Sequence, residues 1–374
     1  MDSVIRNRTH AVRTAMAASE LNGLLVSNEE NRFYLSGFTG KDSGLDESAG
    51  ALIITPDHLI LATDSRFTVQ AASEATGYQI VTYKQGLSKE LPGIVDNLGI
   101  HRLGVESTWI SHKHYNQLAD ELACLNPPPK LIPTENIVET LRRIKSPDEV
   151  DRTCRALRVA EQAFATVLKT LCPGLTEKEV AWALEKAMRE NGADGLSFPV
   201  IVAAGPNSAL PHAIPTDRRI QAGEPVLFDW GARLAGYCSD TSRTVILGKP
   251  DERFMKIFDT VVTARDMAIA AIRAGAGGTA IDRIARDHID QMGFAGAFGH
   301  SLGHGTGLAI HEAPRLSPVK DERLEAGMIV TVEPGIYLPD WGGVRMENQV
   351  LVTDDGARVL NSDSGPFDPV IRVP

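Results

Sequence analysis

The stretch VLFDWGARLAGYCSDTSRTVIL at residues 226–247 is the most informative part of the chain. It contains two apolar runs joined by a short turn, which is the pattern of a β-hairpin. With the turn centred between Leu234 and Ala235, we expect Asp229 and Asp240 to be direct cross-strand partners on one face. Carboxylates held opposite each other in apolar surroundings repel, and a shared cation removes that conflict. For a hairpin taken alone, two solvent-facing acids are the simpler interpretation.

Two further acids occur in similar surroundings. Glu333 ends the β-branched apolar run of MIVTVEPGIY, residues 328–337, where a carboxylate is costly unless it is paired or bound to a metal. Glu347 interrupts the alternation of GGVRMENQVLVT, residues 342–353, and Arg345 lies two residues away on the same face. Arg345 is therefore expected either to orient Glu347 or to meet a carboxylate or carbonyl of a substrate.

Between these two pairs of acids lies GHSLGHGTGLAIHEAP, residues 299–314, with four glycines and three histidines. Glycines let the backbone approach a ligand closely, and histidines near buried acids favour metal ligation or proton transfer. Four carboxylates with an imidazole predict a site for Mn, Co, Fe or Zn, since no thiolate takes part. Four carboxylates are more than one ion requires, so we expect two ions bridged by carboxylates and a water. Such a pair generates hydroxide near neutral pH and polarises a carbonyl.

The rest of the 374-residue chain predicts two domains of mixed α/β (α+β) structure. Helix and strand patterns alternate from the start to about residue 125. The stretch NPPPKLIPTEN, residues 126–136, then contains prolines that break both helix and strand. We therefore expect an N-terminal domain at 1–126, a linker with a connecting helix at 127–145, and a C-terminal domain at 146–374.

The predicted C-terminal domain begins with a well-marked helix. Ser146 is a capping residue, Pro147 suits the first helical position, and Glu149 completes a capping box. We expect this helix to run to about residue 171, with further helices at 176–190, 252–274 and 281–292 and strands at 198–204, 225–247 and 328–353. Two helices followed by strands, twice over, indicate a duplicated half.

Charge and composition exclude several classes of protein. The formal charge of −10 argues against binding to nucleic acid or to an anionic membrane surface. The four cysteines are scattered and form no CxxC pair, which favours reduced thiols and a cytoplasmic location. The opening residues contain no apolar segment of a secretory signal, and no eighteen apolar residues run together.

In their order and local sequence, five residues resemble the metal ligands of the peptidase family that contains methionine aminopeptidase, aminopeptidase P and prolidase. These are Asp229, Asp240, His304, Glu333 and Glu347. The resemblance covers nearly the whole chain and implies a C-terminal domain of the pita-bread fold. It also implies that Asp229 chelates one ion, that His304 and Glu333 hold the other, and that Asp240 and Glu347 bridge both.

The family also uses residues beyond the metal ligands. The resemblance implies that His212 in SALPHAIPT and His311 in AIHEAP steady the scissile carbonyl and the tetrahedral intermediate. It places His300 in GHSLGH nearer the proline side and makes Glu333 the base for the bridging water. These assignments agree with the needs of amide hydrolysis, which are donors for a developing oxyanion and an acceptor for a proton.

The N-terminal half resembles the accessory domain of the proline-specific members, through NRFYLSGFTG, LIITPD and ATDSRFTVQA. The implied function is an Xaa-Pro aminopeptidase with two ions, Mn or Co first and Zn or Fe as alternatives. A prolidase that acts only on dipeptides is the alternative, and creatinase or a catalytically inactive binding module are further ones. Family habit also implies a homodimer. The acidic segment KDSGLDES, residues 41–48, departs from the family pattern and is either a surface loop or a partner contact.

Overall fold

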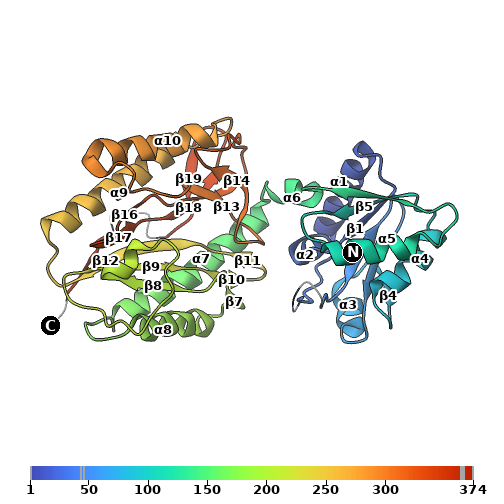
Figure 1. Cartoon of the computed structure of the whole chain (residues 1–374), viewed down its shortest axis with the longest axis horizontal. Helices are drawn as coiled ribbons and strands as arrows, with labels where there is room; N and C mark the ends of the chain where they lie inside the picture. The colour runs from blue at the N-terminus through green and yellow to red at the C-terminus, as the bar shows by residue number, and fades with distance from the viewer. Residues whose placement is uncertain (1, 43, 45–46, 363–366, 373–374) are drawn as a thin grey trace. The chain divides into compact units, whose positions relative to one another are not determined.

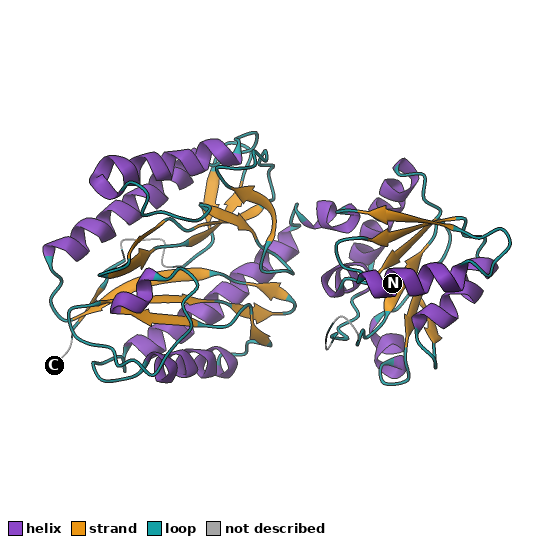
Figure 2. Ribbon diagram, viewed as in Figure 1, coloured by secondary structure: helices purple, strands orange, loops and turns teal. Residues whose placement is uncertain are grey.

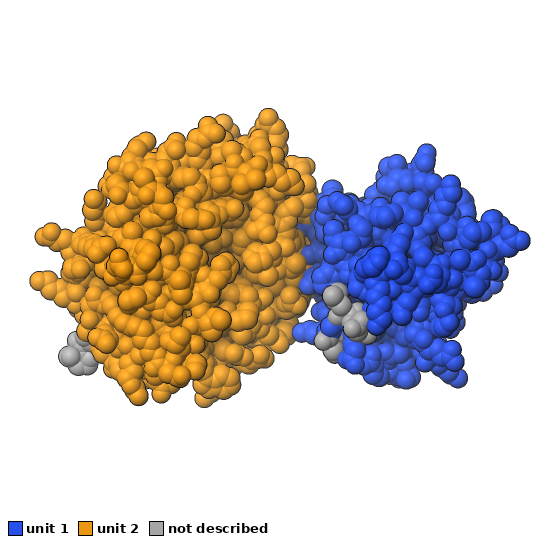
Figure 3. All heavy atoms as spheres, viewed as in Figure 1, with its two compact units in different colours: residues 1–142 blue, residues 143–374 orange. Residues whose placement is uncertain are grey.

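The computed structural model describes residues 2–42, 44, 47–362 and 367–372. The chain divides into two compact units, residues 1–142 and 143–374, which Figure 3 shows in different colours. The first unit extends beyond the predicted boundary at residue 126. Lys130–Thr134 forms strand β6, which pairs in parallel with β5, and Ile137–Arg142 forms helix α6. A strand and a helix of the first unit therefore occupy most of the segment expected to be a linker with a connecting helix.

Pro133 is compatible with β6 because this strand is the outermost of its sheet. The backbone N–H of Lys130 donates to His101 O at 2.9 Å, so alternate residues of β6 direct their amides toward β5. Pro133 is out of phase with Lys130, so its nitrogen, which has no hydrogen, faces the open edge. A proline-rich run can thus belong to an edge strand. The prolines of residues 126–136 therefore do not by themselves mark the boundary between the two units.

The first unit is a six-stranded sheet covered by helices, with the strand order β4-β3-β2-β1-β5-β6. Strand β2 runs antiparallel to both of its neighbours, and the other pairs are parallel. The strands are β1 Gly23–Val26, β2 Ala51–Ile54, β3 Leu59–Thr63, β4 Gln79–Thr82 and β5 Arg102–Glu106. The helices are α1 Ser3–Ala18, α2 Glu29–Ser36, α3 Thr68–Glu74, α4 Leu87–Asn97 and α5 His112–Leu122.

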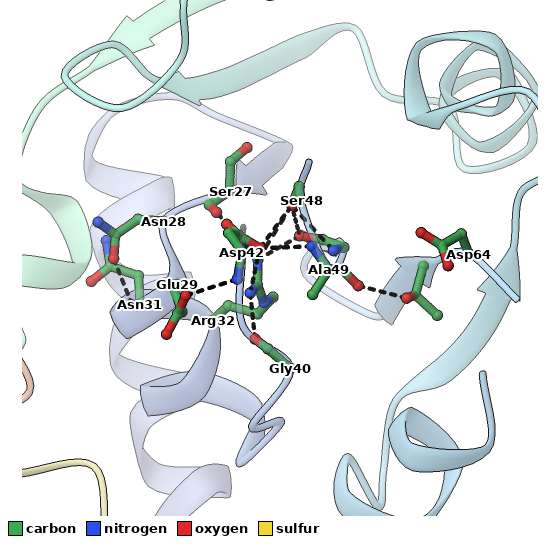
Figure 4. Close-up of polar contacts among 12 residues, drawn as sticks. Ser27, Asn28, Glu29, Asn31, Arg32, Gly40, Asp42, Ser48, Ala49 and Asp64 are labelled. Atoms are coloured by element: carbon green, nitrogen blue, oxygen red, sulfur yellow. Dashed lines mark hydrogen bonds and ion pairs between the residues drawn. The ribbon is translucent and has the colours of Figure 1, made fainter. Parts of the chain in front are cut away.

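A buried arginine holds part of the acidic segment against the first unit (Figure 4). Arg32 Nη2 donates to Asp42 Oδ1 at 2.9 Å and to Gly40 O at 2.7 Å, while Nη1 donates to Gly50 O at 2.7 Å. Asp42 Oδ1 also accepts from Ala49 N at 2.6 Å. Both ends of the segment are therefore fixed. Residues 43, 45 and 46, the centre of the segment predicted to be a surface loop or a partner contact, lie outside the described residues.

In the second unit, one pair of helices covers each side of the strands (Figures 1 and 2). Helix α7, Pro147–Leu168, begins at the predicted capping box of Ser146 and Glu149. The other helices are α8 Glu177–Glu190, α9 Glu252–Ala271 and α10 Gly278–Ile289, with the 3₁₀ turn η1 Gly205–Ala209 and the π turn η2 Asp290–Phe294. Helices α7 and α8 share an apolar core with β8, β9 and β12, and α9 and α10 share one with β15 and β18.

Among the residues of this unit that the structure describes, the strands form four sheets. One has the order β20-β12-β9-β8, and a second has the order β14-β13-β15-β18-β19. Strands β16 and β17 form a pair, and β11, β10 and β7 form a small sheet. The strands are β7 Gly195–Leu196, β8 Ile201–Ala204, β9 Pro225–Trp230, β10 Ala232–Leu234, β11 Tyr237–Cys238, β12 Thr241–Leu247, β13 Gly303–Gly305, β14 Glu312–Leu316, β15 Ile329–Val332, β16 Gly335–Leu338, β17 Gly342–Arg345, β18 Asn348–Val352, β19 Ala357–Val359 and β20 Val370–Ile371.

The register of the 226–247 hairpin differs from the predicted one. Its turn is centred between Ala235 and Gly236, whose φ angles are 49° and 85°. A tight two-residue hairpin turn needs positive φ at both central positions, and glycine is the residue that adopts it most easily. Asp229 therefore pairs with Ser242 and not with Asp240. The shift is by two residues, so the two aspartates become diagonal neighbours on the same face.

Candidate metal centre

Asp229, Asp240 and Glu347 come together where the strands of the second unit meet. Asp229 lies near the end of β9, Asp240 directly precedes β12, and Glu347 lies in the bend between β17 and β18. One oxygen atom from each of the three carboxylates lies within 4.8 Å of the other two. Asp240 is 5% exposed and Glu347 is 1% exposed. The structure therefore brings these three predicted residues together, with Asp240 and Glu347 buried and Asp229 half-buried.

Glu333 and His304 complete the group. His304 Nε2 lies 3.5 Å from Asp240 Oδ2 and 3.4 Å from Glu333 Oε1. His304 Nδ1 lies 3.0 Å from Gly305 O, which can only accept a hydrogen bond. This contact assigns the ring proton to Nδ1 and leaves the lone pair of Nε2 directed toward the carboxylates, which is the arrangement of a metal-binding imidazole.

The electrostatics of the group favour a bound cation. Burial, with the charges of Glu347 and Asp229, raises the pKa of Asp240 well above its ordinary value. Burial, with the charges of Glu333 and Asp229, does the same for the pKa of Glu347. Burial also raises the pKa of Glu333 to about 7 and lowers the pKa of His304 to about 3. Protein groups alone thus leave the charged carboxylates poorly compensated.

Two carboxylate oxygens indicate a bound metal ion more directly. Asp229 Oδ1 and Glu347 Oε1 are buried and accept no hydrogen bond from the residues that the structure describes. Unpaired buried polar atoms are uncommon in folded proteins and call for an explanation. The donor set of four carboxylates and one imidazole suits a divalent ion of the Mn, Co, Fe or Zn type, so the residues present fit a metal.

Arg345 holds the carboxylates through hydrogen bonds and is also one of the residues that line the cavity beside them. Its Nη2 donates to Asp229 Oδ2 at 2.6 Å, and its Nε donates to Ser242 Oγ at 2.8 Å. Ser242 Oγ in turn donates to Glu347 Oε2 at 2.9 Å. The Nη1 of Arg345 donates to Tyr337 Oη at 2.8 Å and to Pro211 O at 3.1 Å. Of the two roles expected for Arg345, orientation of the acids is the one that this geometry supports.

A cavity of about 420 Å³ lies over the cluster. Asp229, Asp240, His304 and Glu333 border it, and Phe198, Ile201 and Ile214 give it apolar walls. The predicted residues His212 and His311 also line this cavity, and both side chains are exposed there. The ring centroids of His304 and His311 are 4.4 Å apart in an edge-to-face arrangement. His212 and His311 can therefore reach a ligand that occupies the cavity.

His300 lines the same cavity, but both of its ring nitrogens already have partners. Its Nδ1 lies 2.9 Å from Ser301 O, and its Nε2 lies 2.9 Å from Tyr337 Oη. Burial lowers the pKa of His300 to about 4, so the ring is neutral near pH 7. In this arrangement His300 offers a ring surface to a ligand and no free ring nitrogen.

Comparison with known proteins places this geometry in a family. The sequence profile of metallopeptidase family M24 matches residues 151–354, and that of the creatinase/prolidase N-terminal domain matches residues 8–144. The chain belongs to metallopeptidase family M24. It is therefore a metallopeptidase, and the predicted family, its pita-bread fold and the predicted class of enzyme are confirmed.

Relatives of this M24 chain include proline-specific peptidases. The chain is 32% identical to the Xaa-Pro dipeptidase of Pyrococcus furiosus over 356 residues, which cover 95% of this chain and 98% of that protein. The structure of an Xaa-Pro dipeptidase from Bacillus anthracis is similar with a TM-score of 0.91 and 37% identity, over 99% of this chain and 100% of that one. An X-Pro aminopeptidase from Thermotoga maritima MSB8 is similar with a TM-score of 0.86 and 32% identity, over 96% and 100% of the chains.

Several residues that hydrogen-bond to the predicted ligands of the M24 centre are not predicted from the sequence. Ser242 joins Arg345 to Glu347, and Thr331 Oγ1 donates to Glu333 Oε1 at 3.1 Å. Gln349 Oε1 accepts from the backbone N–H of Asp240 at 3.1 Å. A correct hairpin register would have identified Ser242 as the cross-strand partner of Asp229. Thr331 lies two residues before Glu333 and could have been found from the alternation of the strand, whereas Gln349 is brought to Asp240 only by the folded sheet. None of the described helices is long and apolar enough to cross a membrane.

Proposed function

We propose that the chain hydrolyses the bond between an N-terminal residue and proline in Xaa-Pro dipeptides. The observation that carries the proposal is the group of four carboxylates and one histidine, all buried or half-buried, beside a cavity with apolar walls. The names of two relatives, the Xaa-Pro dipeptidases of Pyrococcus furiosus and Bacillus anthracis, support dipeptides as the substrate class. The sequence alone favours an aminopeptidase, with the dipeptidase as its alternative, and these relatives support the alternative.

Five residues would hold two divalent ions, with Mn or Co expected and Zn or Fe as alternatives: Asp229, Asp240, His304, Glu333 and Glu347. Bound ions of this kind polarise a carbonyl and lower the pKa of water. Asp240 lies within reach of Asp229 and Glu347 on one side and of His304 on the other, which supports a bridging role. The unpaired oxygens of Asp229 and Glu347 support their roles as ligands.

The remaining groups of the chain orient the substrate and move protons. Glu333, steadied by the hydroxyl of Thr331, accepts the proton of the attacking water. His212 and His311, exposed to the cavity, donate hydrogen bonds to the carbonyl oxygen as it gains negative charge. His300 contributes its ring to the wall that contacts the proline, and Arg345 keeps Asp229 in place.

An Xaa-Pro aminopeptidase that accepts longer peptides is the second candidate. The similarity to the X-Pro aminopeptidase of Thermotoga maritima MSB8 supports it. Both candidate enzymes cleave the same bond with the same proposed metal ligands. They differ in whether the substrate can contain residues after the proline.

A comparison of three peptides by the metal-loaded protein tests the proposal. Ala-Pro, Ala-Pro-Ala and Met-Ala-Ser are incubated with protein loaded with Mn or Co, and the released amino acids are quantified. Cleavage of Ala-Pro alone supports the dipeptidase, and cleavage of Ala-Pro-Ala as well supports the aminopeptidase. Cleavage of Met-Ala-Ser alone would overturn the proline assignment. A chelator-treated sample is the control for metal dependence.

The expected homodimer and cytoplasmic location are separate proposals. Light scattering of the purified protein coupled to size exclusion checks the first, and fractionation of cells checks the second.

A further inference from the structure

The segment that carries His311 is a tight loop between β13 and β14. The chain leaves β13 after Gly305 and returns at Glu312, which pairs with Gly305 across a register shift. Within the loop, Gly307 N donates to Ala309 O at 3.1 Å. The 305–312 loop therefore begins directly after the predicted ligand His304 and contains the predicted catalytic residue His311, and its shape decides where the ring of His311 lies.

The side chain of Glu312 folds back inside this loop. Its Oε1 accepts from the backbone N–H of Ala309 at 3.0 Å, and its side chain is only 7% exposed. A Cβ atom added to Gly307 would lie 2.8 and 2.9 Å from the two carboxylate oxygens, which shows how closely the loop surrounds the carboxylate. The glycine at 307 is required by this close approach.

A buried lysine from a distant part of the sequence neutralises this carboxylate. Lys145 Nζ lies 3.0 Å from Glu312 Oε2, and its side chain is 1% exposed. The backbone of Lys145 is itself fixed, because its N–H donates to Gly327 O at 2.8 Å. Lys145 directly precedes Ser146, the N-cap of α7, so the ammonium group extends from the fixed start of a long helix.

Burial gives this ion pair a strict geometry. Surface ion pairs contribute little and rearrange freely, whereas two buried charges must stay together because neither can be solvated when they separate. Lys145 thus restricts the Glu312 carboxylate to one place, and Glu312 restricts the backbone of the loop through Ala309. His311 directly precedes Glu312 in the chain.

From these contacts we infer that Lys145 is a positioning residue for catalysis. Its ion pair with Glu312 holds the 305–312 loop in the one conformation that presents His311 to the scissile carbonyl. The inference rests on the proposed function of His311. It assigns to the residue before α7 a task at the active site, although Lys145 touches neither the substrate nor the metal ligands.

Lys145→Met tests the inference, because methionine fills similar space without the charge. We expect kcat for Ala-Pro to fall about 10- to 100-fold, with KM within about twofold and bound metal unchanged, since only the position of an oxyanion donor is altered. The matched control is Lys178→Met. Lys178 forms an exposed ion pair with Asp217 at 2.8 Å, so its loss should leave kcat unchanged.

A double-mutant cycle with His311→Ala separates positioning from general stability. If Lys145 acts through His311, Lys145→Met should cause little further loss of kcat in the His311→Ala background. An equal loss in both backgrounds, or a lowered unfolding temperature with unchanged kcat, would overturn the inference. Lys145→Arg keeps the charge and should recover part of the lost activity.

Two provisions keep the result interpretable. If Lys145→Met does not fold, Glu312→Gln removes the same ion pair while keeping an oxygen for Ala309 N, and it enters the same cycle. If the wild-type protein cleaves no Xaa-Pro peptide but cleaves Met-Ala-Ser, the proposed function fails. The coupling between Lys145 and His311 is then measured with the peptide that is cleaved, so the two ideas are judged separately.

Discussion

Glu333→Gln is expected to act in opposite directions on the metal-free and on the metal-loaded protein. Burial raises the pKa of Glu333 from 4.5 to about 7 in the metal-free protein. The folded-state pKa lies above the unfolded one, so the stability contributed by this group is complete below pH 4.5 and is lost as pH rises through 7. A shift of this size corresponds to about 3 kcal/mol, so the ionised Glu333 destabilises the metal-free fold by about that amount at pH 8.

Glutamine has nearly the same shape and does not ionise. In chelator-treated protein, Glu333→Gln should therefore raise the free energy of unfolding by about 3 kcal/mol at pH 8 and change it little at pH 4.5. For a unit of this size the midpoint of thermal unfolding at pH 8 should rise by roughly 6–12 °C. With Mn or Co present, the same substitution should remove turnover and weaken metal binding, because it removes the charge of a proposed ligand.

The assay is thermal unfolding of wild type and variant at matched pH values from 4.5 to 8, each with chelator and with added metal. The difference between the two proteins cancels the titrating groups that lie far from Glu333. The pKa values of Asp240 and Glu347 depend on the charge of Glu333, so relief of these two acids is part of the measured gain. A variant that is less stable than wild type at pH 8 in chelator would refute the reasoning. So would a stability difference that does not depend on pH.

Four other substitutions test different parts of the site and fold. Asp240→Asn should lower bound metal, measured by elemental analysis, and reduce kcat/KM by more than about 100-fold, because the carboxylate proposed to bridge the ions is lost. His212→Ala should keep the bound metal and lose about 100- to 1000-fold in kcat, and a loss of metal would show that the residue is itself a ligand. Arg345→Met should lower the free energy of unfolding of the metal-free protein by about 3–5 kcal/mol, because Asp229 loses its buried partner; denaturant titration measures this, and an unchanged midpoint would contradict it. Ala235→Gly should raise the unfolding free energy by about 0.5–1 kcal/mol, because Ala235 has a φ of 49° in the hairpin turn, and the same titration checks it.

The sequence is most informative where local chemistry decides the structure. The capping box at Ser146 and Glu149 marks the start of α7 to the residue, because both partners lie within four positions of each other. The four predicted carboxylates come together, as expected for charged side chains in apolar strands, which are costly unless they share a site, whereas the choice of His304 among three histidines comes from the family resemblance. These are strong local constraints, and they can be recognised without knowledge of the fold.

The remaining features depend on contacts between distant residues or on turn geometry. The hairpin register required knowing that Ala235 and not only Gly236 adopts a positive φ, which alanine rarely does. The role of Arg345 depends on Ser242, Tyr337 and Asp229, which reach it from three other strands. Lys145 lies 167 residues from its partner Glu312, so no local pattern links them.

Pro133 has a consequence for how the first unit behaves at high concentration. The outermost strand of a sheet presents unpaired amides to which an extended segment of another chain can add, and such addition starts aggregation. At β6 the proline interrupts that row, because the position facing outward has no hydrogen to give. Pro133, which belongs to the proline-rich run near the domain boundary, therefore also disfavours the pairing of another chain with this edge of the sheet.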